Sequence, residues 1–193
     1  TTLSKMLAGK NVSTSVYISP IRHGISASST PKDLETAFQL MYLTVADPRF
    51  DQEEFQTGIE QLRTILPNLV NTPDFKLQGE ISKTLYGNNP RQTTISMETL
   101  DKASLATIER VYREQLFKDV AGATVYIVGN VDVETLKPLV EKYIGSMPKG
   151  KKAAGWVETG EHFVKGNVEN HFNVTMETPK VTVFQVYSSY IPY

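Results

Sequence analysis

Apolar and polar residues alternate near both ends of the chain, which is the spacing of half-buried strands. Val12 to Ile18 alternates in this way and predicts a strand that Pro20 limits. A second strand or bend is expected over residues 23–29. Residues 171–177 and 181–190 alternate again, so they predict two further strands joined by a short turn.

The middle of the chain instead repeats apolar residues every three or four positions, which predicts helices. Thr30-Pro31 followed by acidic residues is a helix start, and this first helix should end at Asp47-Pro48. Further helices are expected from Asp51 to Pro67, where the proline should kink or end the helix, from Asp74 to Tyr86, and over residues 97–117.

The segment from Val125 to Gly150, VYIVGNVDVETLKPLVEKYIGSMPKG, combines both patterns. A β-branched run (Val125 to Val128) stops at Gly129-Asn130, and Asp132 then opens a helix, so strand, turn and helix follow one another. Together with the flanking elements, this order predicts an α+β fold with a mostly antiparallel sheet covered by helices. Residues 1–193 are expected to form a single domain.

Composition excludes several classes of protein. The chain has 193 residues, of which 40% are hydrophobic and 21% charged, as in globular proteins. A net charge of −1 argues against a nucleic-acid partner, and no apolar stretch approaches the roughly 20 residues that span a bilayer. Cysteine is absent, which fits a reducing cytosol or a bacterial envelope that avoids thiols. Of these, the bacterial periplasm or envelope is favoured.

Three ordered stretches carry a family resemblance. They are VGNVD with YIGSMP, DLETAFQLMYLTVADPRFDQEEF over residues 33–55, and LYGNNPR followed by TLDKASLATIERVYREQL over residues 85–116. Together they resemble the pitrilysin/insulinase family of zinc peptidases, and the resemblance covers nearly the whole chain. It implies a fold like the mitochondrial-processing-peptidase type of metallohydrolase domain, and a bacterial parent is favoured.

The chain departs from this family at the metal motif. Family members consist of four similar α+β domains in two halves that clamp around a peptide, and the first domain carries the zinc-binding motif H-x-x-E-H. The histidines of this chain are His23, His162 and His171, and no two of them lie at helical spacing beside a glutamate. The resemblance therefore implies a non-catalytic domain of the second half, without catalytic or metal-binding residues. Zinc would belong to the catalytic domain of the parent.

The implied partners are the catalytic half of the same polypeptide and a peptide substrate. Candidate peptide-contact residues are Phe184, Tyr187 and Tyr190, which follow near-alternate spacing on the last predicted strand. They could line a peptide-binding wall whose strand edge offers main-chain hydrogen bonds, or equally belong to the interior of a sheet. We interpret the three histidines as surface or structural residues, and the acidic residues 47–54 as a helix start.

Two alternatives remain open from the sequence. The chain could be a catalytically dead relative that acts as a scaffold or assembly subunit of the same fold. It could also be the catalytic domain itself, with the metal-binding helix upstream of Thr1. Both ends of the chain are interpreted as cuts through a longer polypeptide.

Overall fold

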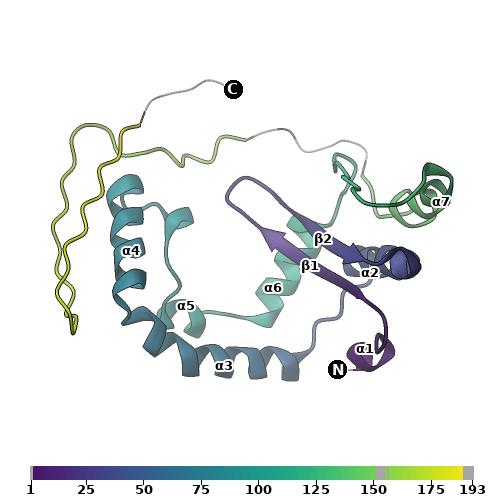
Figure 1. The fold of residues 1–193 in the computed structure, drawn as a ribbon, viewed down its shortest axis with the longest axis horizontal. Helices are drawn as coiled ribbons and strands as arrows, with labels where there is room; N and C mark the ends of the chain where they lie inside the picture. The colour runs from purple at the N-terminus through teal and green to yellow at the C-terminus, as the bar shows by residue number, and fades with distance from the viewer. Residues whose placement is uncertain (1, 151–154, 156, 189–193) are drawn as a thin grey trace. The chain divides into compact units, whose positions relative to one another are not determined.

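The computed structural model describes residues 2–150, 155 and 157–188, and the chain divides into two compact units (Figure 1). Unit 1 comprises residues 1–52 and 104–156, and unit 2 comprises residues 53–103 and 157–193. Unit 1 combines a β-hairpin with helices. Unit 2 combines helices with a long extended segment.

The β-hairpin of unit 1 confirms the first two predicted strands. Strand β1 (Val12–Ile18) pairs with β2 (His23–Ser29) in antiparallel register. The turn between them is braced by Ser19, whose hydroxyl donates to the carbonyl of Arg22 at 2.8 Å and accepts from the backbone N–H of Arg22 at 3.2 Å. The backbone N–H of Ser19 also donates to the carbonyl of Arg22 at 2.8 Å, so main-chain and side-chain bonds together close the turn that contains Pro20.

A buried carboxylate fixes the start of helix α2 (Leu34–Ala46), which follows the 3₁₀ turn η1 (Pro31–Asp33). The Asp33 carboxylate accepts the backbone N–H of Asn11 at 3.0 Å and the hydroxyl of Thr30 at 2.8 Å. These bonds, with that of Asn11 the stronger cause, hold the pKa of Asp33 below its usual range. Thr30 lies at the start of this segment, as expected. Its hydroxyl bonds the Asp33 carboxylate and makes no cap hydrogen bond to a backbone N–H.

Helix α2 packs against both strands and supplies one wall of the unit 1 core. The centre of this core is formed by Val45, Phe117 and Met147. The partly buried hydrophobic residues packed around it are Val16, Ile25, Met41, Tyr42, Tyr112, Leu116, Val120 and Ile144. A helix-covered antiparallel sheet confirms the predicted α+β class, although this sheet has only two strands in the described part of the chain.

The helical pattern predicted over residues 97–117 is split into three elements. They are α5 (Met97–Asp101), α6 (Leu105–Val111) and the π-helical turn η3 (Tyr112–Leu116). The break precedes Ser104, whose hydroxyl accepts the N–H of Thr107 at 3.4 Å and so starts a new helix.

The segment after the predicted VGN strand folds as expected. The Asp132 carboxylate accepts the N–H of Thr135 at 2.7 Å and starts helix α7 (Val133–Leu139), which continues into the π-helical turn η4 (Val140–Ile144). The strand predicted at residues 125–128 is wrong, because these residues are assigned to no strand and Val128 is 97% exposed. A β-branched run becomes a strand only when another backbone lies beside it.

Unit 2 contains helices α3 (Gln52–Val70) and α4 (Pro73–Tyr86), followed by the 3₁₀ turn η2 (Pro90–Gln92). Pro67 was expected to kink or end this helix; it does not end it, since the helix continues to Val70. Pro67 lies in the last turn of the helix, where few further backbone bonds depend on it. None of the helices in the described ranges is long and apolar enough to cross a bilayer.

The two strands predicted near the C-terminus are not formed in the residues that the structure describes. Residues 171–177 and 181–188 run without helix or ladder, and the chain reverses direction near residues 177–180 (Figure 1). Residues 189 and 190, the end of the second predicted strand, lie outside the described residues. The alternating pattern correctly indicates extended backbone, but it does not supply a partner strand.

The unit 1 core can be tested by a pair of truncations. Phe117→Ala removes a side chain that is 7% exposed, so it should lower the free energy of unfolding by roughly 3 kcal/mol or more. Val128→Ala changes a residue that is 97% exposed and should stay within about 0.5 kcal/mol of the parent. Urea unfolding followed by circular dichroism measures both variants. Equal losses would contradict the core described here.

Candidate peptide-contact site

The candidate peptide-contact residues lie on the extended segment 181–188. Phe184 is 59% exposed and Tyr187 is 85% exposed, whereas Tyr190 lies outside the described residues. Val181 and Val183 on the same segment are 91% and 84% exposed. Within the described chain this segment thus presents apolar and aromatic side chains to solvent, and their contact with a peptide stays a prediction.

The main chain of segment 181–188 is also open. Within the described ranges, no backbone hydrogen bond joins these residues to another segment. Extended backbone with unpaired N–H and C=O groups can accept a further strand, and exposed alternate side chains then decide which strand fits. The segment therefore combines the two features that recognition of an extended peptide requires.

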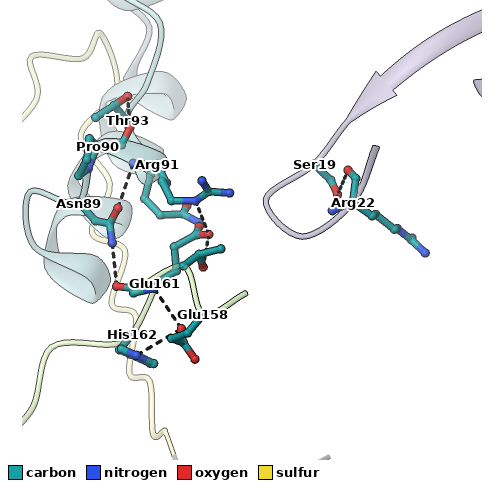
Figure 2. Close-up of polar contacts among 12 residues, drawn as sticks. Ser19, Arg22, Asn89, Pro90, Arg91, Thr93, Glu158, Glu161 and His162 are labelled. Atoms are coloured by element: carbon teal, nitrogen blue, oxygen red, sulfur yellow. Dashed lines mark hydrogen bonds and ion pairs between the residues drawn. The ribbon is translucent and has the colours of Figure 1, made fainter. Parts of the chain in front are cut away.

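The segment belongs to a longer extended arm of unit 2, residues 157–188. Glu161 anchors this arm to the turn η2 of the same unit. The carboxylate of Glu161 accepts Nε of Arg91 at 2.8 Å, Nε2 of Gln92 at 2.6 Å and the hydroxyl of Thr159 at 3.1 Å. Figure 2 shows Arg91 and Glu161 pointing toward each other. These donors, Arg91 first and Gln92 next, lower the pKa of Glu161, whose side chain is 9% exposed.

Further contacts hold the first half of the arm on α4 and the turn that follows it. The side-chain amide of Asn89 donates to the carbonyl of Gly160 at 3.1 Å (Figure 2), and the N–H of Val164 donates to the carbonyl of Leu85 at 2.8 Å. Two side-chain contacts complete the set, Asn170 with Glu80 and Thr84, and Phe163 with the ring of Tyr86.

The three histidines occupy separate positions in the fold. Nε2 of His23 lies 2.8 Å from the carbonyl oxygen of Leu116, and the His23 ring meets Phe117 edge-on at 5.9 Å. The His23 ring thus contacts the last residue of the π-helical turn η3, Leu116, which fits the structural interpretation of this histidine. His162 lies 3.5 Å from Glu158 (Figure 2). His171 lies 3.8 Å from Glu169, again an acid close in sequence.

These surroundings do not fit a zinc ion. Among the residues that the structure describes, no three histidine or carboxylate side chains converge as a metal site requires. The acidic residues near position 50 are explained by the helix: Glu53 and Glu54 lie in the first turn of α3, and Asp51 pairs with Arg49 at 3.0 Å.

The Arg91–Glu161 anchor was not predicted from the sequence. Its partners are 70 positions apart. Arg91 ends the stretch LYGNNPR, but nothing in that stretch indicates its partner, and Glu161 lies outside the three stretches. An arginine and a glutamate at the surface of a chain with 20 basic and 21 acidic residues give no local signal. Only the fold identifies this pair.

Comparisons with known proteins agree with this picture. Residues 110–189 match the sequence profile of the peptidase M16 inactive domain. An Arabidopsis thaliana protein, "Zinc protease PQQL-like", is 32% identical over 120 residues, which are 61% of this chain and 12% of that protein. The chain thus spans a small fraction of the length of this relative.

Two solved structures share the fold. One is the ferredoxin protease FusC, in complex with Arabidopsis ferredoxin, with a TM-score of 0.61 and 20% identity over 84% of this chain and 17% of that one. The other is a protease from Helicobacter pylori, with a TM-score of 0.58 and 20% identity over 78% of this chain and 37% of that one.

The profile match and the shared fold make this chain similar to domains of M16 peptidases, the family that its sequence resembles. The match to the inactive domain of that family covers residues 110–189. The prediction of family and of a non-catalytic domain is therefore confirmed.

The histidine positions predict that this chain alone does not retain zinc. After purification and dialysis, elemental analysis should find zinc near zero per chain, because one imidazole cannot hold the ion without convergent partners. A matched measurement after incubation with excess zinc should fall back to the same level on dialysis. One zinc per chain that resists dialysis would contradict the interpretation of all three histidines.

The anchor predicts a pH dependence of the arm. The pKa of Glu161 is lowered by folding, so the anchor is complete above the usual glutamate value of 4.5 and is lost as pH falls through the lowered value. Glu161→Gln should act like acid and reduce hydrogen-exchange protection of the Val164 amide, which bonds to Leu85. Glu158→Gln is the control, because Glu158 contacts only residues of the arm itself. Equal protection in both variants would refute the anchor.

Proposed function

We propose that this domain completes the peptide-binding chamber of a zinc metalloendopeptidase, whose bond cleavage is carried out by a separate catalytic half. The domain supplies a surface for the peptide and no reacting group. The extended arm, with its exposed Phe184 and Tyr187, contributes that surface. The zinc and its H-x-x-E-H motif belong to the catalytic domain of the parent.

One observation carries the proposal: the arm is fixed at its base and open at its end. Glu161 holds the base through Arg91 and Gln92, whereas residues 181–188 have no backbone partner in the described chain. A segment held in extended form loses less conformational freedom when a peptide pairs with it, and so binds more tightly than a free tail. An apolar surface of this kind needs a partner that covers it.

The arm distinguishes the proposal from the scaffold alternative. A scaffold subunit needs a folded partner surface, while a chamber wall binds extended peptides of varied sequence through their main chain. Main-chain pairing at an open edge is the mode that the arm supports.

Peptide binding to the 193-residue chain tests the proposal. The probe is a fluorescein-labelled, unstructured 15-residue peptide of alternating apolar and polar residues, followed by fluorescence anisotropy. Tyr187→Ala should weaken binding by roughly fivefold or more, because an exposed aromatic side chain at a contact is lost. Tyr126→Ala is the matched control, since Tyr126 is 87% exposed and Tyr187 85% exposed, and it should leave binding unchanged.

Two results would refute this function. The first is equal affinity of the Tyr187→Ala and Tyr126→Ala variants, which would mean that the arm is not the contact. The second is saturable binding of folded proteins with none of extended peptides, which would favour the scaffold. The isolated chain should also leave the peptide uncut, as mass spectrometry of the mixture will show.

A further inference from the structure

We propose that a groove along helix α4 is a second peptide-binding site, distinct from the open end of the arm, residues 181–188. It takes an extended acidic peptide, with an apolar side chain at one end of the groove and carboxylates at the other. This proposal rests on the proposed function only in assuming that the ligand is a polypeptide.

The groove consists of two neighbouring hollows in unit 2, of about 340 Å³ and about 620 Å³. Gly79 and Glu80 of α4 and Thr94 line both hollows, so these three residues form the waist between them. Their volumes fall in the range of ligand sites, about 300–1,000 Å³. The smaller hollow is the apolar end, and the hydrophobic side chains that line it are Val70, Phe75, Phe172 and Val174.

Gly79 keeps the waist open. A Cβ at this position would meet only the side chain of Thr94, at 3.8 Å, so alanine fits without a clash. Glycine is the least favourable residue in a helix interior after proline, and alanine the most favourable. The helix thus has a residue of low helix propensity at the position where a longer side chain would fill the groove.

The charges of the groove favour an acidic ligand. Three lysines and two glutamates line it, which gives a formal net charge of +1. Lys102 pairs with Glu98 at 2.6 Å. Glu80 accepts the amide of Asn170 at 2.8 Å. The ammonium groups of Lys76 and Lys83 make no hydrogen bond or ion pair with the residues described, so they remain available to ligand carboxylates.

The polar end of the groove can also bind main chain. Lys83 stands there among hydroxyl and amide side chains, which are those of Asn88, Asn89, Gln92, Thr93, Ser96 and Thr99. The Asn89 and Gln92 amides already bond Gly160 and Glu161 of the arm. Main-chain contacts to a peptide therefore fall to Asn88 and to the remaining lone pairs of the Thr93, Ser96 and Thr99 hydroxyls.

Helix geometry sets the spacing of the ligand. Phe75, at the apolar end, and Lys83, at the polar end, are separated by eight helical residues, which is about 12 Å along the axis. An extended peptide advances about 3.3 Å per residue, so roughly four residues cover this distance. The fitting motif is an apolar residue with carboxylates four positions away.

The test uses the intact chain and a symmetric peptide that can bind in either direction. The fluorescein-labelled probe is Glu-Glu-Ser-Ser-Ser-Leu-Ser-Ser-Ser-Glu-Glu, and a second probe carries lysine in place of each glutamate. The acidic peptide should bind at least about tenfold more tightly at low salt, and added salt should weaken its binding. Equal affinity for both peptides would overturn the proposal.

Substitution of Gly79, at the waist, is the second part of the test. Gly79→Leu should weaken binding of the acidic peptide by at least about tenfold, because the side chain fills the groove. Gly79→Ala should bind normally and shows that the helix tolerates the change. Gly58→Leu is the matched control, since Gly58 lies inside α3 with open space around its Cβ position. Circular dichroism confirms that each variant is folded.

The outcomes separate this site from the open arm. If Gly79→Leu binds the acidic peptide like Gly58→Leu, the groove is not a site, whatever the arm does. If Tyr187→Ala binds the alternating peptide normally while Gly79→Leu abolishes binding of the acidic peptide, the groove stands and the arm fails. Normal binding in all variants would refute both.

Discussion

The ion pair between Glu161 and Arg91 is the contact on which the arm of unit 2 depends. A carboxylate that is 9% exposed is stable only while its oxygens are fully satisfied, and here Gln92 and Thr159 complete the set. The arm has no ladder hydrogen bonds and buries few of its side chains beyond this point. Its placement on α4 therefore follows from a few polar contacts near its base, and the exposure of its end follows from their absence farther along.

Helices of this chain were predictable because their signals are local. Asp132 caps the helix that follows it within three residues, and apolar spacing marks the buried faces. The new helix start at Ser104 was missed, because the apolar spacing of residues 97–117 continues across it. The strands predicted at residues 125–128 and 181–188 do not form, because a strand requires a partner that no local pattern specifies. β1 and β2 were predicted correctly since a short turn brings the partner into register.

The candidate site shows the same division. Phe184 and Tyr187 were selected from spacing alone, and the structure finds both exposed, without testing their role. The anchor at Glu161 was missed because its partner lies 70 positions away, and the groove at Gly79 because it takes its walls from separate segments. What the sequence did indicate is the inactive type of M16 domain, which residues 110–189 match.

Helix α4 contacts the arm and also lines the groove. Glu80 of this helix accepts a hydrogen bond from Asn170 of the arm. The neighbouring Gly79 lines the groove. Phe172 of the arm also lines the apolar end of the groove. A peptide that packs against Phe172 would therefore stabilise the arm in its anchored position, and an anchored arm would complete the groove. Because such coupling is reciprocal, each ligand should raise the affinity for the other by the same factor. If the two peptides bind independently, the arm does not move with the groove, and α4 is a rigid support for two separate sites.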